Sequence, residues 1–437
     1  MPAARRTYSS CRSSGSSGFT CDWVVPSMTS EYPPFVPRPG RSVARTSRPW
    51  SSRLGSAMAS TLGRRGSRGQ RARPRKNVRE VGSVRTMAAR ASGEGMHRMP
   101  ATSTPVAVGW DERVLAEQSE PHFMQSSTWE RLRSDGPWRS RRLPEVDGHG
   151  LPVLAYEREV PGYGTLQHLP RVSGIDSEGV ARFSERVRAH RGSAFATKLE
   201  VHQPYDHALV AAFEEHGWQP SRASQYRHAV VVETGMSEAE ILGRMKKRAR
   251  SEIRVAERNG VIAGRARMTR ENREHMLALV AETADRSGAF FRSSDYLERV
   301  WTEFAADGRG WLHFAWHDGR VVAGAFVVAY GPNAWYKDGG SLRDRPQLMA
   351  SRYLQWDVIR ELAAAGVRRY DLGHVPPPDE PDAPGQGVLT FKSAFAREVL
   401  VYMPALLLAH DARAEEFRRG ESAFIEAHRR RTGDYWY

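Results

Sequence analysis

The sequence predicts a mixed α/β protein of the α+β type, because helical and strand patterns alternate from about residue 104 onward. An internal repeat supports this class. The helical pattern of 206–216 runs through Gly217 towards a strand, and about 150 residues later the helical pattern of 348–365 runs through Gly366 into the buried strand 370–372. Two copies of one helix–glycine–strand unit indicate a duplicated domain.

Local patterns predict the individual elements. Asp318 and Gly319 lie between two apolar runs, which is typical of a β-hairpin. Ser237 and Glu240 form a capping-box pattern that opens one long helix over 237–259. The remaining apolar patterns predict strands at 153–156, 194–201, 312–316, 321–330, 334–337 and 369–372, and a helix at 271–286.

The first hundred residues differ in composition from the rest. They hold 19 of the 65 Lys and Arg residues but only 4 of the 50 Asp and Glu residues, so the whole net charge of +15 lies there. Residues 1–103 are rich in Ser, Gly, Arg and Pro without apolar periodicity, which predicts a disordered and dispensable basic tail. The alternatives are a tether for nucleic acid or membrane, or a stretch upstream of a true start at Met87, Met96 or Met99. The balanced charge of 101–437 excludes a generally basic, histone-like body.

Both cysteines, Cys11 and Cys21, lie in that first stretch. Residues 101–437 therefore cannot use a cysteine nucleophile, cysteine-ligated zinc, an iron–sulfur cluster or a disulfide. The histidines show no metal-ligand spacing, so we expect no metal and no cofactor. The sequence also lacks an apolar run long enough to span a bilayer and a signal-peptide core. We expect a cytoplasmic protein that at most contacts the inner membrane surface.

Several motifs, in order, resemble the FemABX aminoacyltransferases. The motifs are Phe123–Trp129 with Arg133 and Trp138, the basic helix Met245–Arg254 with Asn259–Val261, the hairpin at Asp318–Gly319, Trp335–Tyr336 with Gly339–Ser341, Tyr353–Trp356, Tyr370–Gly373, and Phe391–Phe395. No long coiled-coil insertion is visible, so the chain resembles the compact, FemX-like members.

This resemblance implies two acetyltransferase-like (GNAT) domains, at 104–232, completed by 404–437, and at 233–403. It further implies a peptide-bond-forming enzyme that takes an amino acid, for example glycine, from aminoacyl-tRNA. The acceptor would be the stem peptide of a peptidoglycan precursor, either lipid II or UDP-MurNAc-pentapeptide. We expect a monomer.

Lys392 is the main catalytic candidate. Only six of the 65 basic residues are Lys, and Lys392 lies beside Phe391 in an apolar, strand-like stretch, where a compact ammonium replaces the usual Arg. The resemblance places the family's catalytic-centre Lys here, with Phe391 packed beside it. Its role would be to stabilise the oxyanion that forms when the acceptor amine attacks the aminoacyl ester directly. The alternative is a solvent-facing Lys at a strand edge.

The substrate-binding candidates are mostly arginines. Arg133 and Arg292 match the family's anchors for the precursor diphosphate, which guanidinium groups can bind bidentately, although either could be a surface Arg. Tyr336 matches an aromatic residue of the precursor site, or is a core residue. The basic helix offers contacts to the tRNA backbone or a solvated face, through Lys246, Lys247, Arg250 and Arg254.

Two candidate residues and two rival functions remain open. Asp371 is a proton acceptor or a structural turn residue, and His374 has no assigned role. A CoA-dependent N-acyltransferase on the same fold is the rival enzyme, although the turn before the helix, 343–350, lacks the glycines that would hold a pyrophosphate. A non-enzymatic protein that binds RNA or a wall precursor is the second rival.

Overall fold

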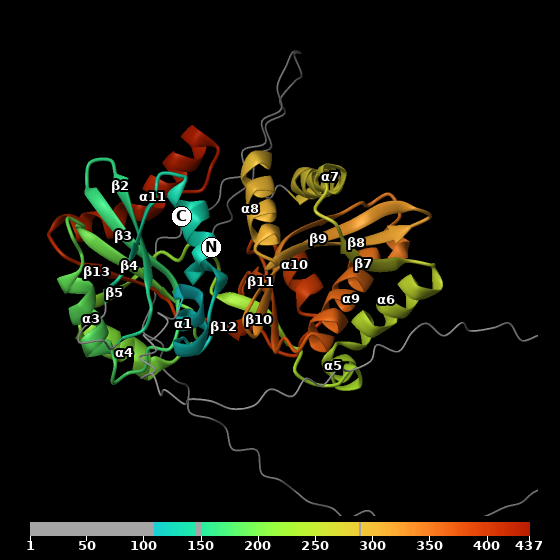
Figure 1. The fold of residues 1–437 in the computed structure, drawn as a ribbon, viewed down its shortest axis with the longest axis horizontal. Helices are drawn as coiled ribbons and strands as arrows, with labels where there is room; N and C mark the ends of the chain where they lie inside the picture. The colour runs from blue at the N-terminus through green and yellow to red at the C-terminus, as the bar shows by residue number, and fades with distance from the viewer. Residues whose placement is uncertain (1–108, 145–149, 288–289) are drawn as a thin grey trace, which may run out of the picture. The chain divides into compact units, whose positions relative to one another are not determined.

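The computed structural model describes residues 109–144, 150–287 and 290–437, and the predicted basic tail 1–103 lies outside this part of the chain. Residues 105–437 form one compact unit that contains two mixed β-sheets (Figure 1). The predicted α+β class is therefore confirmed. None of the described helices is long and apolar enough to cross a membrane.

The first sheet has six strands and is covered on both faces. Helices α3 (Val180–Ala189) and α4 (His207–Glu215) pack on one face, and α11 (Arg413–Thr432) packs on the other. In spatial order the strands are β1 (Arg139–Arg142), β2 (Leu154–Val160), β3 (Gly164–Val172), β4 (Ala196–Val201), β13 (Ala405–Ala409) and β5 (Trp218–Ser221). The C-terminal part of the chain thus supplies β13 and α11 to the first sheet.

The second sheet has seven strands. Helices α5 (Glu238–Arg244), α6 (Lys247–Arg258), α9 (Ala350–Ala364) and α10 (Gln386–Lys392) lie on one face, and α7 (Arg270–Ser287) and α8 (Ser294–Ala306) cover the other (Figure 1). In spatial order the strands are β12 (Leu400–Val401), β6 (His228–Glu233), β11 (Arg369–Val375), β10 (Asn333–Ser341), β9 (Arg320–Tyr330), β8 (Gly310–His317) and β7 (Ile262–Ala266).

Each sheet contains one parallel strand pair, β3–β4 and β10–β11, each flanked by antiparallel strands. In the first sheet the pair runs from Leu166 opposite Ala196 to Leu169 opposite Leu199, and after a register shift it pairs again at Val172 opposite Val201. Gly217 and Gly366 follow α4 and α9 with φ of +86° and +76°, the left-handed conformation that glycine adopts at helix ends. The sequence repeat, however, does not mark equivalent strands. The strand after Gly217 is β5, which pairs antiparallel with β13, whereas the strand after Gly366 is β11, which pairs in parallel with β10.

Two predicted elements differ in the structure. The predicted helix 237–259 is two helices, α5 and α6, because Met245 and Lys246 adopt extended backbone between them. The amide of Lys246 donates to the carbonyl of Ala394 at 3.0 Å, a distant partner that replaces the intrahelical bond. The stretch around Lys392, predicted as strand-like, is the end of helix α10.

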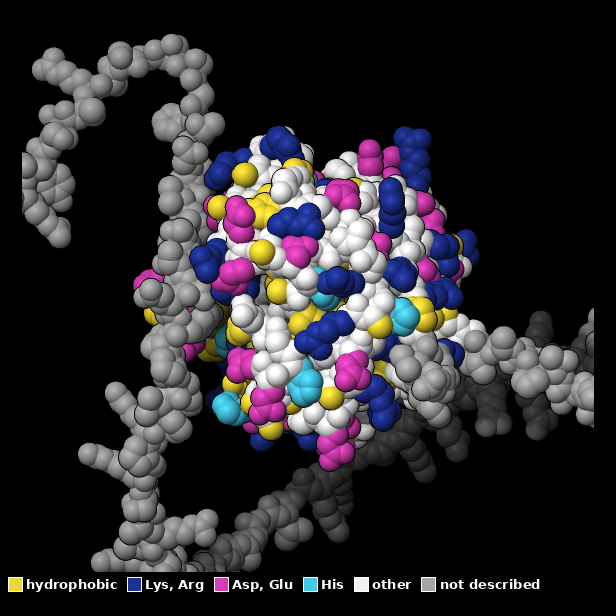
Figure 2. Space-filling model, turned by 90° about the vertical axis from the view of Figure 1, so that its left-hand side faces the viewer, with side chains coloured by type: hydrophobic (Ala, Val, Ile, Leu, Met, Phe, Trp, Pro, Cys, Tyr) yellow, Lys and Arg dark blue, Asp and Glu magenta, His cyan; other side chains and the backbone are white. Residues whose placement is uncertain are grey.

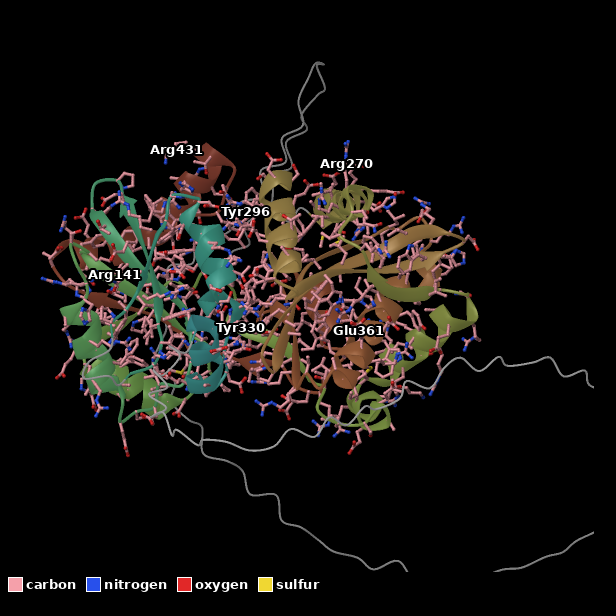
Figure 3. The ribbon with its side chains drawn as sticks, viewed as in Figure 1. Arg141, Arg270, Tyr296, Tyr330, Glu361 and Arg431 are labelled. Atoms are coloured by element: carbon pink, nitrogen blue, oxygen red, sulfur yellow. The ribbon has the colours of Figure 1, made fainter. Side chains whose placement is uncertain are left out.

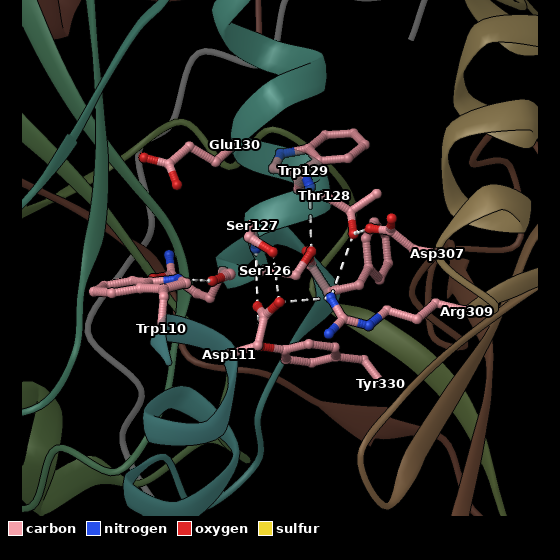
Figure 4. Close-up of polar contacts among 12 residues, drawn as sticks. Trp110, Asp111, Ser126, Ser127, Thr128, Trp129, Glu130, Asp307, Arg309 and Tyr330 are labelled. Atoms are coloured by element: carbon pink, nitrogen blue, oxygen red, sulfur yellow. Dashed lines mark hydrogen bonds and ion pairs between the residues drawn. The ribbon is translucent and has the colours of Figure 1, made fainter. Parts of the chain in front are cut away.

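A hydrogen-bond network around Asp111 joins α1 (Trp110–Glu117) and α2 (Ser127–Ser134) to the second sheet (Figure 4). The Asp111 carboxylate accepts from the Ser127 amide at 2.9 Å, from the Arg309 guanidinium at 2.8 Å and from the Tyr330 hydroxyl at 2.9 Å. Burial alone would raise the pKa of Asp111, but the bonds from Ser127 and Arg309 outweigh it and hold the pKa below its ordinary value. The network fixes the start of α2 against the hairpin β8–β9.

We expect Asp111→Asn to lower the free energy of unfolding by about 2 kcal/mol, because it weakens bonds that are made to a charged group. A depressed pKa contributes stability above the ordinary value and loses it as the pH falls through the folded-state value. The difference between wild type and variant should therefore shrink below about pH 4. Urea unfolding at pH 7 and pH 3 measures both effects. Asp285→Asn, at an exposed position without a described partner, is the control.

Candidate functional site

The second sheet opens where β10 and β11 separate. Their parallel pairing ends at Trp335 and Asp371, although both strands continue. At the same level β10 has a register shift between Tyr336 and Asp338, and β11 has one between Asp371 and His374. These irregularities lie in the pairing of β10 with β9 and of β11 with β6. We call the place beyond Trp335 and Asp371, where β10 and β11 are no longer paired, the opening.

The side chain of Lys392 enters this opening from the end of α10. Its Nζ donates to the main-chain carbonyl of His374 at 3.1 Å. Gly373 has a φ of +84°, and a Cβ there would lie 3.2 Å from Nζ and 3.9 Å from the carbonyl oxygen of Tyr336. Glycine at 373 is therefore needed both for the backbone conformation and for the space that the ammonium occupies.

The Lys392 ammonium has no carboxylate within ion-pair distance among the described residues. Burial lowers its pKa to about 8, and the nearby charge of Asp371 opposes this effect only in part. Asp371 is itself buried, which raises its pKa, and it accepts from the Gly373 amide at 2.6 Å and from the Tyr402 hydroxyl at 3.3 Å. Asp371 thus holds the irregular turn of β11, as one of the two alternatives expects, and also lies near the ammonium.

His374 links the opening to the first sheet. Its ring nitrogen lies 3.3 Å from the Arg171 guanidinium, and Arg171 lies 3.9 Å from the Glu200 carboxylate. Burial, reinforced by the charges of Arg171 and Lys392, lowers the pKa of His374 well below its ordinary value. A neutral imidazole is therefore expected here, although the sequence did not suggest a role for it.

Helix α10 is fixed to α9 and α6 by Arg352. Its guanidinium pairs with Glu252 at 2.8 Å, donates to the carbonyl of Phe391 at 2.7 Å, and lies 4.5 Å from the centre of the Phe391 ring. Phe391 also packs edge-on against Phe395 at 5.6 Å. Phe391 thus packs against Arg352 and Phe395 and helps to hold the end of α10, where Lys392 lies. Sequence analysis did not identify Arg352, because one Arg on a helix carries no distinguishing signal in so Arg-rich a chain.

Arg133, Arg158 and Arg292 gather at a second place, around an aromatic group. Arg133 lies 4.8 Å and Arg158 5.6 Å from the centre of the Trp138 ring. Arg292 lies 4.5 Å from the ring of Tyr296, which points from α8 towards α2 (Figure 3). We call Arg133, Arg158 and Arg292 the arginine cluster. The structure thus brings the two predicted phosphate anchors near one another and adds Arg158, which the sequence did not single out.

The charges of the arginine cluster influence one another. Burial, reinforced by the charge of Arg292, lowers the pKa of Arg133 to about 10. Burial, together with Arg133 and Arg292, also lowers the pKa of Arg158 to about 10. Arg133 and Arg158 thus remain charged near neutral pH. Guanidinium groups gathered in this way have the chemistry to bind an anion.

Residues of β10 lie near both places. Tyr336, the predicted precursor contact, is partly buried against the core beside the opening, and burial raises its pKa. Its neighbour Lys337 pairs with Asp338 at 3.2 Å. Burial raises the pKa of Tyr435, and the nearby charge of Lys337 opposes this rise in part. Tyr435 in turn lies 5.0 Å from Arg292. Tyr336 therefore lies beside the opening, and the next residue of β10, Lys337, lies near Tyr435, which contacts the arginine cluster.

The four predicted tRNA contacts divide into two pairs. The Lys246 ammonium donates to the Ser393 hydroxyl at 3.0 Å, and Arg250 donates to the carbonyls of Leu242 at 3.2 Å and Met245 at 2.6 Å. These two cations support the junction of α5, α6 and α10. Lys247 and Arg254 are exposed on α6, without a described partner.

The turn before α9 contacts two carboxylate side chains of the same chain. The Arg343 amide donates to the Glu282 carboxylate at 3.0 Å, and Arg345 pairs with Asp318 at 3.2 Å. The left-handed position before the helix is Met349, with φ of +53°, rather than a glycine. A pyrophosphate at this turn would therefore meet negative charge and an amide that is already bonded.

One family model and several solved structures match this chain. Residues 243–384 match the family model for an acetyltransferase (GNAT) domain. Among solved structures, the chain is similar to the crystal structure of FemX, with 14% identity over 71% of this chain and 97% of that chain, and a TM-score of 0.64. The structure of L-PGS from Bacillus licheniformis also matches, with 14% identity over 72% and 96% of the chains and a TM-score of 0.47. No curated protein matches.

The fold is thus a tandem GNAT arrangement like that of FemX, as predicted. Residues 243–384, which match the acetyltransferase domain, include strands β7 to β11 of the second sheet.

Proposed function

We propose that this protein is an aminoacyltransferase that moves an amino acid from aminoacyl-tRNA to the stem peptide of a peptidoglycan precursor. The observation that carries the proposal is the Lys392 ammonium in the opening between β10 and β11, with a single carbonyl as its described partner. An ammonium without a carboxylate partner can stabilise the negative charge of a developing oxyanion.

In the proposed reaction the acceptor amine attacks the aminoacyl ester carbonyl, and the carbonyl oxygen becomes an oxyanion beside Lys392. Collapse of this intermediate breaks the ester bond and releases the tRNA hydroxyl, which takes up the proton that the amine loses. Burial strengthens the interaction of the ammonium with the oxyanion, because fewer waters screen it. Asp371 and Gly373 act indirectly, by holding β11 in the shape that admits the side chain.

The arginine cluster supports an acceptor that carries a diphosphate. Guanidinium groups bind phosphate oxygens bidentately, and three of them can share the two phosphates. The exposed Lys247 and Arg254 support a contact with the RNA backbone, which would fall as the salt concentration rises. The face shown in Figure 2 mixes basic and acidic side chains, in keeping with an electrically balanced body rather than a general nucleic-acid-binding surface.

The CoA-dependent acyltransferase is less well supported. Its cofactor needs free amides at the turn before α9. That turn places Glu282 and Asp318 against Arg343 and Arg345 instead.

The decisive experiment is incubation of the protein with a pool of charged tRNAs and with either lipid II or UDP-MurNAc-pentapeptide, followed by mass spectrometry of the acceptor. We expect the acceptor to gain the mass of one amino acid. Ribonuclease should abolish this gain, and acetyl-CoA should not affect it. Transfer from acetyl-CoA that resists ribonuclease would establish the rival enzyme. Lys392→Met is the control for contaminating activity.

A further inference from the structure

The last residues of the described chain lie against the arginine cluster. Arg292 pairs with the Asp434 carboxylate at 2.7 Å and donates to the main-chain oxygen of Tyr437. Arg158 donates to the carbonyl of Trp436 at 2.8 Å and lies 3.6 Å from the centre of the Trp436 ring. Segment 434–437 is therefore an internal ligand of the cluster.

The segment is firmly held at one end and loosely at the other. Trp436 is buried, and the Tyr437 hydroxyl donates to the buried Glu421 carboxylate at 2.5 Å. The Asp434 side chain is 52% exposed. Water can therefore compete for this carboxylate, whereas its partner Arg292 has a side chain that is only 15% exposed. The Asp434 carboxylate can thus leave Arg292 while Trp436 and Tyr437 stay in place.

Several donors around the cluster are not used within the described part of the protein. Arg133 makes contacts with the rings of Trp138 and Tyr156 but no described hydrogen bond or ion pair. The indole N–H of Trp138 and the hydroxyl of Tyr156 are buried and also have no partner there. Buried polar groups are normally hydrogen-bonded, so an arrangement of unused donors and three cations indicates a site for an anionic ligand.

We propose that Arg158 is a third anion-binding residue of this site and that Asp434 is its internal counter-ion, which a diphosphate displaces from Arg292 on binding. The proposal deepens the proposed function, on which it rests for the identity of the acceptor. Asp434 would keep the site partly neutral when it is empty. A ligand with one negative charge gains little by replacing it, whereas a diphosphate adds charge for Arg133 and Arg158 as well. The pairing with Asp434 therefore favours diphosphates over single carboxylates or phosphates.

The test is isothermal titration of the full-length protein with inorganic pyrophosphate, UDP, farnesyl diphosphate and inorganic phosphate. Arg158→Gln should weaken pyrophosphate binding about tenfold, the effect of losing one bond to a charged group. Asp434→Asn should tighten it about two- to fivefold, since the competing ion pair is lost. UDP and farnesyl diphosphate distinguish a nucleotide-linked from a lipid-linked acceptor. Inorganic phosphate should gain more from Asp434→Asn than pyrophosphate does, because the counter-ion that disfavours it is lost.

Two matched variants control for general effects of charge. Arg141→Gln removes a partly exposed Arg from the neighbouring strand, and Asp411→Asn removes an Asp that pairs with Arg413 at the same 2.7 Å. Neither should change binding. Arg158→Lys should recover part of the affinity, and thermal melting confirms that each variant is folded.

The opposite signs separate binding from structure. If Arg158→Gln and Asp434→Asn both weaken binding, or if neither changes it, the proposal is wrong. If both behave as expected but no charged tRNA supports transfer, the anion site stands and the proposed function fails.

Discussion

Replacing Lys392 by Met is expected to lower kcat by about 10²–10³, the typical effect of removing one oxyanion donor. Affinity for the precursor should change little, because the ammonium interacts with charge that appears only as the amine attacks. Single-turnover kinetics at saturating precursor measure the rate separately from binding. A variant that keeps its rate and loses only affinity would show that Lys392 binds substrate and does not stabilise the transition state.

The pH dependence of kcat distinguishes two roles for Lys392. Burial lowers its pKa to about 8. If the ammonium is the active form, kcat should fall as the pH rises through about 8, because Lys392 loses its charge. Lys392→Arg should abolish this fall in kcat, because a guanidinium stays charged. If the neutral amine acted as a base instead, kcat would rise through the same pH and Lys392→Arg would be inactive.

Arg133→Ala is the contrasting variant for the same experiment. A phosphate carries the same charge before and during the attack. Loss of the Arg133 side chain should therefore raise KM for the precursor, with less effect on kcat. Equal changes in kcat for Lys392→Met and Arg133→Ala would contradict the separation of chemistry from anchoring.

Replacing Arg352 by Ala is expected to cost about 3 kcal/mol in the free energy of unfolding, because it leaves the carboxylate of Glu252 and the carbonyl of Phe391 without their buried partner. The value lies at the lower end for a broken buried ion pair, since Arg248 still pairs with Glu252 at 2.7 Å. Because Arg352 also fixes the end of α10, kcat should fall in the fraction that remains folded.

Chemical denaturation and a double-mutant cycle with Glu252→Gln measure this coupling. The control is Arg248→Ala, whose side chain is 78% exposed and which should change stability by less than about 1 kcal/mol. A loss as small as that of the control would show that α10 does not depend on Arg352.

The sequence predicts the elements whose signals are local. The capping box of Ser237 and Glu240 is present, with the Ser237 amide 2.9 Å from the Glu240 carboxylate. The hairpin at Asp318 and Gly319 has positive φ at both residues, +50° and +74°, as its turn type requires. Both glycines of the repeated helix–glycine–strand unit end a helix with positive φ, but only the strand after Gly366 belongs to a parallel pair.

Features that depend on distant partners could not be read from local patterns. The break at Met245 and Lys246 depends on the carbonyl of Ala394, about 150 residues away, whereas the apolar stripe continues across the break. The proposed role of Arg158 depends on Trp436, to which it donates, and on Asp434, which pairs with Arg292. Both partners come from the end of the described chain. In a chain that uses Arg for nearly every cation, residue type alone could not separate Arg158 from its neighbours.

The unequal strand pairs have a consequence for stoichiometry. Pair β3–β4 pairs again at Val172 and Val201 after its register shift, whereas β10–β11 does not pair again after its three residue pairs. Within the described residues, the proposed function therefore has room for a donor at only one of the two duplicated units. On that proposal, one chain should bind one equivalent of donor, without cooperativity between its halves. The proposed function would then leave the first unit free of the constraints of catalysis, so that its sequence could change to suit new acceptors while the reaction chemistry stays the same.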